Sequence, residues 1–284
     1  MPRQRDREKP TGEAAATLRI HLLGPPEVVW ADRVLHLPRR QVRALLYRLA
    51  AGAQPVPREK LSYLFWPDTP EADARRNLRG LLSHLRHALP LPDLLLASED
   101  MVGLDPDRTR SDTVLFERLC AAPGPAAQAE ALQQAVDLYR GPFLAGFSLP
   151  GCQEFEIWAA GERRNWERLY LEALATLVEQ QAAKGQYAAA IAYARRYLAT
   201  DDLSEEIHRR LIELYAASGD RSAALRQYEQ CLTILERELG VDPLAETQAA
   251  YQAALEGPPP PRTAPVAEPV WTTLPGLDLP LIGR

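Results

Sequence analysis

The chain has 284 residues and a formal net charge of −5 at pH 7, with 46% hydrophobic and 25% charged residues. This is the composition of a globular protein, and the length suffices for two domains with buried cores. No stretch approaches the ~20 apolar residues of a membrane span, and residues 1–17 mix charge signs without the apolar core of a signal peptide. We therefore expect a cytoplasmic protein with a disordered head at 1–17 and no membrane partner.

The charge is unevenly distributed along the chain. Residues 39–89 contain ten Lys and Arg against four Asp and Glu, so this block has six excess positive charges and the rest of the chain carries −11. From residue 113 to the end, 15 basic residues stand against 23 acidic ones. A phosphate-binding surface needs local positive potential, and residues 39–89 are where the sequence favours one.

The sequence predicts neither an enzyme nor a cofactor or metal site. Cys120, Cys152 and Cys231 are far apart, form no CxxC pair and are expected to be reduced thiols. None of the five histidines has a Cys or carboxylate at metal-ligand spacing. The sequence also contains no Gly-x-Ser-x-Gly and no glycine-rich phosphate loop.

Residues 18–111 predict a small sheet, three helices and a terminal hairpin. Pro38 ends the last strand, Gly52 caps the first helix, Pro57 lies in the first turn of the second helix, and the hairpin turns at 98–100. This order of elements is that of a winged helix-turn-helix, whose third helix enters the major groove of DNA. The expected strands are Leu18–Gly24, Glu27–Trp30 and Val34–Leu37, the helices Arg39–Ala51, Pro57–Trp66 and Thr69–Pro90, and the hairpin strands 94–97 and 101–104.

The third helix is predicted to have two opposed faces. Its leucines recur every three or four residues and form one apolar stripe: Leu78, Leu81, Leu82, Leu85 and Leu89. The opposite side holds basic and polar residues, namely Arg75, Arg76, Arg79, Ser83 and Arg86, flanked by Asn77 and His87. Guanidinium groups pair with guanine edges or phosphates, and Asn pairs with adenine. The simpler interpretation is an ordinary solvated basic face, with His84 and His87 as packing or groove-side residues.

The predicted hairpin has acidic residues at its tip. Glu99 and Asp100 would repel phosphate, so contacts of this wing with DNA would have to come from backbone or from Arg108 and Arg110. Arg39 and Arg58, which open the first two helices, complete the candidate DNA-binding residues.

Residues 112–256 predict an all-α domain that ends in a helical repeat. At an offset of 34 residues Gly185 aligns with Gly219 and Ala190 with Ala224, as do four further pairs: Leu177 and Leu211, Val178 and Ile212, Ala182 and Ala216, and Leu198 and Leu232. This is the period of tetratricopeptide (TPR) repeats, in which a Gly turns the chain between paired helices. Such a scaffold usually binds peptides or proteins.

Two amphipathic helices are expected ahead of the repeat, at Ala131–Phe147 and Glu154–Leu174. Trp158, Trp166 and Tyr170 are predicted to lie in the core. Because Arg163, Arg164 and Arg168 alternate with Glu162 and Glu167, they are predicted to form a salt-bridged surface and not a second anion site.

Together these segments resemble the SARP-type bacterial transcriptional regulators, in which a winged helix is joined to a bacterial transcriptional activation domain. The resemblance covers about 18–255. It is carried by RRQVRALLYRLA at 39, PREKLSYLFWPD at 57, ADARRNLRGLLSHLRHAL at 72, DLYRGPFLAGF at 137, the 158–174 helix and ELGVDPLAET at 238.

The resemblance implies an activator that binds direct repeats near promoters, as a dimer or on tandem half-sites, and recruits RNA polymerase. Carried over by position, the residues that contact bases and phosphates are Arg75, Arg76, Asn77, Arg79, Ser83 and Arg86. The fold class is then mainly α, an α+β winged helix at 18–111 followed by an all-α TPR-like domain at 112–256. The residues alone leave open a second function, a protein-interaction scaffold whose basic helix docks an acidic partner.

The final segment, 257–284, is predicted to be a proline-rich linker. GPPPPRTAPVAEP cannot pack or form a helix. The last six residues, LPLIGR, are similar to the opening of the nucleotide-binding domain of larger members of that family. No GxxxxGK[ST] occurs in the sequence, so we expect these 284 residues to have no ATPase activity.

Overall fold

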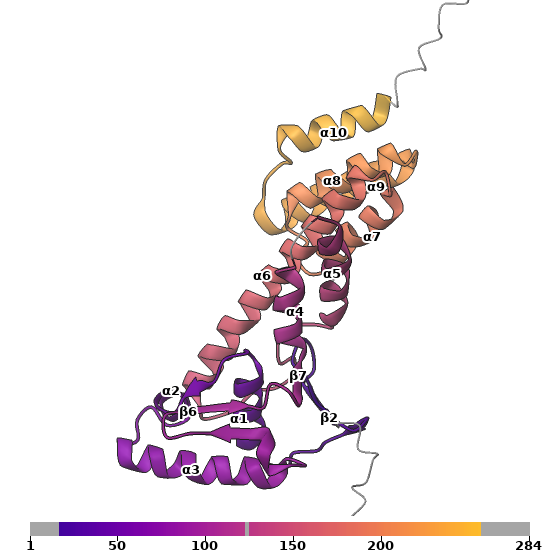
Figure 1. The fold of residues 1–284 in the computed structure, drawn as a ribbon. Helices are drawn as coiled ribbons and strands as arrows, with labels where there is room; N and C mark the ends of the chain where they lie inside the picture. The colour runs from indigo at the N-terminus through magenta and orange to yellow at the C-terminus, as the bar shows by residue number, and fades with distance from the viewer. Residues whose placement is uncertain (1–16, 123–124, 257–284) are drawn as a thin grey trace, which may run out of the picture.

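The computed structural model describes residues 17–122 and 125–256, except the side chains of 125–127. The predicted head and linker therefore lie outside the described residues, apart from Thr17. The described chain is elongated, with a small α/β part at one end and stacked helices at the other (Figure 1). None of its helices is long and apolar enough to cross a membrane.

Two small sheets flank the first three helices. One has the order β3-β2-β1-β7, in which β1 pairs antiparallel with β2 and parallel with β7. The other, the wing sheet, has the order β4-β6-β5. The elements of this part are β1 Leu18–His21, β2 Glu27–Trp30, β3 Arg33–Val34, α1 Arg40–Ala50, β4 Val56–Pro57, α2 Arg58–Phe65, α3 Glu71–Ala88, the short 3-10 helix η1 Pro92–Leu94, β5 Leu95–Ala97, β6 Met101–Leu104 and β7 Thr109–Ser111.

The rest of the described chain is helical, as predicted. Its elements are α4 Asp112–Cys120, α5 Pro125–Leu138, α6 Gln153–Ala183, α7 Tyr187–Leu198, α8 Glu205–Ala217, α9 Arg221–Leu239 and α10 Ala245–Glu256. The repeat is present: Gly185 and Gly219 turn the chain after α6 and α8 with φ of 69° and 85°, and the aligned Ala190 and Ala224 are fully buried where the paired helices pack.

Several predicted boundaries were wrong. The strand expected at Val34–Leu37 ends at Val34, because after the hydrogen bond from Leu35 N to Val28 O (2.8 Å) the chain leaves the sheet for α1. Gly52 does not cap α1, since the C-cap is Ala51 in a right-handed helical conformation. Pro57 precedes α2 and pairs in β4, a strand that was not predicted.

The helix expected at Ala131–Phe147 ends at Leu138. Gly141 and Leu144 have φ of 153° and 52°, values that no α-helix contains. The segment instead packs on the end of β1, where Leu144 N donates to Leu22 O at 2.8 Å. Phe143 and Leu144 are fully buried there, so tertiary packing outweighs the helical pattern.

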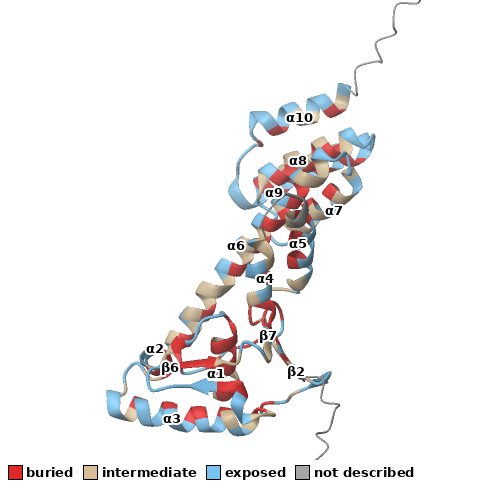
Figure 2. Cartoon of the chain, in the orientation of Figure 1, coloured by how far each residue is buried: buried red, intermediate tan, exposed pale blue. Residues whose placement is uncertain are grey.

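One hydrophobic core joins the two parts of the molecule. It runs from β1 and α1–α3 through α4 and α5 and along α6 as far as Leu177 (Figure 2). Tyr47 of α1 packs edge-to-face on Phe147 with ring centres 5.1 Å apart, and Phe65 of α2 stacks on Phe155 of α6 at 6.0 Å. Trp166 and Tyr170 are buried and Trp158 is half-buried, as predicted.

A buried carboxylate ties β1 to α4. Asp112 accepts hydrogen bonds from Leu22 N, Leu23 N and Thr113 N at 2.8–3.0 Å. Burial raises the pKa of Asp112, and these backbone donors oppose that rise. The carboxylate fixes the start of α4 against the first sheet.

Candidate nucleic-acid interface

Helix α3 lies along the outer edge of the α/β part, at the opposite end of the molecule from α8–α10 (Figure 1). The leucine stripe is buried, from Leu78 to Leu89, and packs into the core beside α1 and α2. Asp73 N and Ala74 N donate to Pro70 O where the helix begins. The apolar side thus fixes the orientation of the polar side.

The polar side of α3 is open to solvent. Arg75, Arg76, Arg79 and Ser83 are exposed, and Arg86 is half-exposed. At 3.6 residues per turn these five positions fall within an arc of roughly 100°. Asn77 is also exposed but lies about 100° further round the helix than Arg76, at the edge of the face. The structure therefore brings five of the six α3 candidates together.

The four arginines of this face have different surroundings. Arg75 pairs with Glu71, and Arg76 pairs with Asp73 at 3.0 Å. Within residues 17–122 and 125–256, Arg79 and Arg86 have no ion-pair or hydrogen-bond partner. Neither ion pair was predicted, although the spacing of four and three residues between acid and arginine is the sequence signal for helical ion pairs.

Arg39 and Arg58 lie off this face. Arg39 is exposed just before α1, and no described hydrogen bond or ion pair joins it to α3. Arg58 Nε donates to Ser98 O at 2.8 Å, which holds the guanidinium at the turn of the β5–β6 hairpin. That hairpin is the predicted wing, so Arg58 supplies the basic group that its acidic tip lacks.

Arg108 and Arg110, which were expected to supply contacts of the wing, both have partners within the protein. Arg108 pairs with Asp93 at 2.8 Å, and Arg110 donates to Pro106 O and Thr109 O. Both lie at β7, which pairs with β1 in the other sheet.

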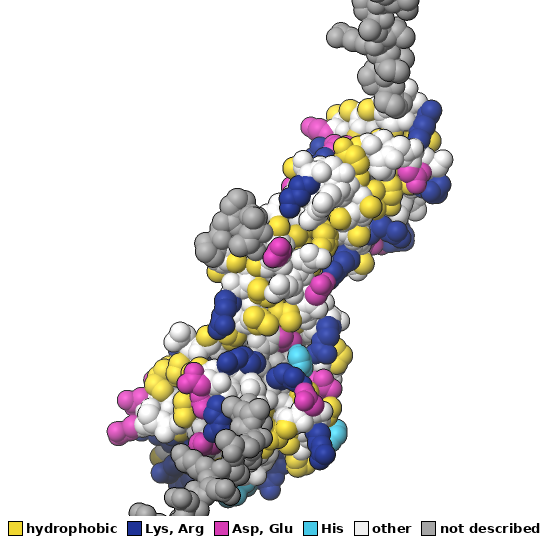
Figure 3. Space-filling view, turned by 45° about the vertical axis from the view of Figure 1, so that its right-hand side comes forward, with side chains coloured by type: hydrophobic (Ala, Val, Ile, Leu, Met, Phe, Trp, Pro, Cys, Tyr) yellow, Lys and Arg dark blue, Asp and Glu magenta, His cyan; other side chains and the backbone are white. Residues whose placement is uncertain are grey.

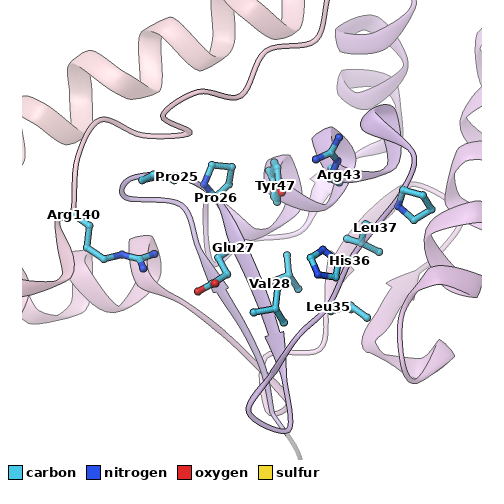
Figure 4. A pocket seen from close by; sticks show the side chains of 12 residues that line it. Pro25, Pro26, Glu27, Val28, Leu35, His36, Leu37, Arg43, Tyr47 and Arg140 are labelled. Atoms are coloured by element: carbon cyan, nitrogen blue, oxygen red, sulfur yellow. The ribbon is translucent and has the colours of Figure 1, made fainter.

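Other basic residues of block 39–89 are used inside the protein. Arg43 and Arg48 stack on Phe147 and Trp158, with 5.6 and 5.1 Å from guanidinium carbon to ring centre. Arg43 also lines a depression of about 570 Å³ beside β2, together with Glu27, Tyr47 and Arg140 (Figure 4). In the space-filling view of Figure 3, Lys and Arg side chains at this end of the molecule alternate with acidic ones. The charge excess of the block therefore overstates the basic surface.

Arg163 was predicted to belong to a salt-bridged surface, and that is wrong. Its guanidinium donates to Phe143 O and Phe147 O at 3.0 and 3.2 Å, which ties α6 to the loop before it. Arg168 does form the expected kind of surface pair, with Glu172 at 2.6 Å.

The remaining chemistry of the described residues is sparse. No group of three His, Cys, Asp or Glu side chains there could hold a metal ion. The three cysteines are free, and burial raises the pKa of Cys120 and Cys231 to about 11, so both are thiols at neutral pH. His87 Nδ1 lies 2.7 Å from Ser83 O and donates to it within α3.

Comparison with known proteins adds three findings. The family described as "Bacterial transcriptional activator domain" matches residues 107–255. Regulatory protein AfsR of Streptomyces griseus is 29% identical over 265 residues, which is 89% of this chain and 26% of AfsR, so the chain spans about a quarter of that relative. The structure of Mycobacterium tuberculosis EmbR in complex with a low affinity phosphopeptide is similar with a TM-score of 0.63 and 25% identity, over 86% of this chain and 67% of that one.

Proposed function

Because the chain belongs to the bacterial transcriptional activator domain family and is a regulator of the SARP type, we propose that it binds specific DNA sequences by inserting α3 into the major groove. The observation that carries this proposal is the outer face of α3. Arg79 and Arg86 lie there without a partner in the part of the chain that the structure describes, on a helix whose other side is fixed in the core. A rigid helix with free guanidinium groups can read guanine edges and position phosphates without first breaking contacts of its own.

The candidate residues divide into two roles. Arg79, Arg75, Arg76 and Arg86, with Ser83 and Asn77, would contact bases and phosphates in the groove. Arg58 at the wing and Arg39 before α1 would contact the backbone only, and would add affinity without sequence preference.

We further propose a division of labour along the chain. Residues 18–111 would read direct repeats near promoters, as a dimer or as tandem copies, and residues 112–256 would recruit RNA polymerase. The turns at Gly185 and Gly219 and the buried small residues of the repeat support a protein-binding role for the second part. This activity belongs in the cytoplasm, where bacterial DNA and polymerase lie.

The test is selection of bound fragments from a random duplex pool, followed by affinity measurements at two salt concentrations. A DNA reader should enrich one sequence, and its affinity should fall steeply with salt, with a slope of about −0.9 per phosphate contacted. Arg79→Ala should cost about 1–3 kcal/mol on the selected site. Arg226→Ala, an exposed arginine of α9, is the matched control and should leave the affinity unchanged.

The alternative is a scaffold whose α3 docks an acidic protein. Enrichment of no sequence, together with equal affinity for all duplexes, would favour that scaffold and end the proposal. Recruitment of polymerase has its own test, transcription in vitro from a promoter with the selected repeat, and an unchanged transcript level would refute it.

A further inference from the structure

A second cavity, of about 390 Å³, opens where the wing sheet, β7 and α4 meet near the end of α1. Its volume lies within the range of roughly 300–1,000 Å³ that is usual for small-molecule sites. None of the eight residues proposed above to contact DNA lines it, although Arg110, which was expected to supply wing contacts, does. It is therefore distinct from the face of α3.

The walls of this cavity are largely apolar. Leu49 of α1, Leu104 of β6, and Val114 and Leu115 of α4 contribute side chains. Leu115 is 42% exposed, so an apolar part of a ligand could cover it. Burial of such surface provides about 25 cal/mol per Å².

The charged side chains that line the cavity are all positive. Arg19, Arg110 and Arg118 line the cavity, and none of its lining residues is acidic. Arg110 Nη1 is held by Pro106 O at 2.6 Å and Thr109 O at 3.0 Å, which leaves other N–H groups of that guanidinium for a ligand. Arg118 is exposed and has no partner among the described residues, whereas Arg19 is partly neutralised by Asp32 at 2.5 Å.

We propose that this cavity binds a small organic anion, a carboxylate or sulfonate on an apolar body. The arginines would repel an organic cation, and an inorganic anion would leave the apolar walls uncovered. The walls come from both the α/β part and α4, which Thr113 Oγ1 links to Ala50 O of α1 at 3.2 Å. A ligand there would contact both halves of the molecule.

Titration with 1-anilinonaphthalene-8-sulfonate, a fluorescent aromatic anion, tests the proposal on the intact chain. We expect saturable binding that decanoate competes for and decylammonium does not. Leu115→Glu places a carboxylate in the cavity and should weaken probe binding at least about tenfold, since a buried like-charge contact costs more than 1.4 kcal/mol. Ile157→Glu on α6, another exposed aliphatic position but outside the cavity, is the control and should bind as the wild type does.

Arg118→Gln is a second test, at an exposed side chain whose replacement should not disturb the hydrophobic core. Its side chain has no described partner, so the fold should be unaffected while probe affinity falls several-fold; Arg226→Gln should have no effect. Wild-type affinity in both Leu115→Glu and Arg118→Gln would overturn the proposal. So would equal competition by decylammonium, or equal losses in the control variants.

Discussion

The arginines of α3 show how neighbouring carboxylates divide one basic face into paired and unpaired charges. Glu71 and Arg75 are both largely exposed, so their pair contributes only about 0.3–0.5 kcal/mol to helix stability. In the proposed DNA complex its larger effect would be on binding, because a guanidinium already paired with a carboxylate must exchange that partner for a phosphate.

We therefore expect Glu71→Gln to raise the affinity for random duplexes and to steepen the salt slope by about one unit, as one more phosphate contact would. Fluorescence anisotropy over a salt series measures both quantities. Glu172→Gln, which breaks the equally spaced pair with Arg168 on α6, is the control. An identical effect of the two substitutions would mean that only net charge matters and that Glu71 has no special relation to Arg75.

His208 makes the stability of the repeat depend on pH. Burial lowers the pKa of His208, and Gln227 Nε2 donates to its Nδ1 at 2.7 Å, so the ring is neutral and its Nε2 donates to Asp202 O at 3.0 Å. The unfolded chain binds the proton near pH 6.5 whereas the folded chain resists it. The contribution of His208 to the unfolding free energy is therefore greatest above that pH, and it decreases as the pH drops below it.

Urea denaturation at pH 7.5 and 5.5 should show this loss, at most about 1.4 kcal/mol per pH unit for one group. His21, whose pKa burial also lowers, acts in the same direction. His208→Gln should remove the part of the pH dependence of the unfolding free energy that comes from His208. A pH dependence that is as steep in this variant would assign the effect to other groups.

Residue roles that depend on distant partners could not be predicted. Arg43 and Arg163 look like surface cations in the sequence, yet both contact the loop between α5 and α6, which lies far along the chain from Arg43 and just before the helix of Arg163. The α3 face was predictable because its pattern is contained in one helix.

At the scale of elements, two kinds of glycine have opposite consequences. Gly219 has a φ of 85° between α8 and α9, a conformation that side chains disfavour, although nothing would touch an added Cβ. Gly161 also has open space around it but lies within helical α6.

Gly219→Val should therefore destabilise the repeat by at least about 1–2 kcal/mol, whereas Gly161→Ala should stabilise the chain by about 0.5–1 kcal/mol. Thermal unfolding followed by circular dichroism measures both. The two changes in stability need not be equal in size, but a stabilising Gly219→Val would contradict the prediction of backbone strain.

The elements that were predicted are those with a strong local period. Leucine spacing was sufficient for α3, and the 34-residue offset for the turns at 185 and 219. The strand β4 was not predicted, and the segment 139–147 was wrongly predicted to be helical, because their conformations depend on partners elsewhere, Val102 for β4 and the end of β1 for the loop. Short strands carry too little pattern of their own to be recognised.

At the scale of the whole molecule, the shared core makes the two parts one folding unit. Phe155 of α6 is fully buried against Phe65 of α2, and Trp166 packs on Phe116 of α4. We therefore expect Phe155→Ala to cost about 3–5 kcal/mol, and to speed hydrogen exchange in α3 as well as in α6.

The matched control is Ile157→Ala, an exposed position two residues along α6, which should leave exchange unchanged. If the α3 amides kept their protection from hydrogen exchange in Phe155→Ala, the α/β part would be stable by itself. The shared core would then contribute little to its stability.

The continuous helix α6 has a further consequence. With 31 residues it is about 46 Å long, and its beginning is anchored beside α2 while its end is the first helix of the repeat. In the proposed complex with DNA, a protein bound to the repeat would therefore be held at one fixed angle around the DNA axis. Moving the recognition sequence by half a turn of the duplex, about 5 base pairs, should place that bound protein on the opposite side of the promoter and reduce transcription. Moving it by a full turn should restore transcription.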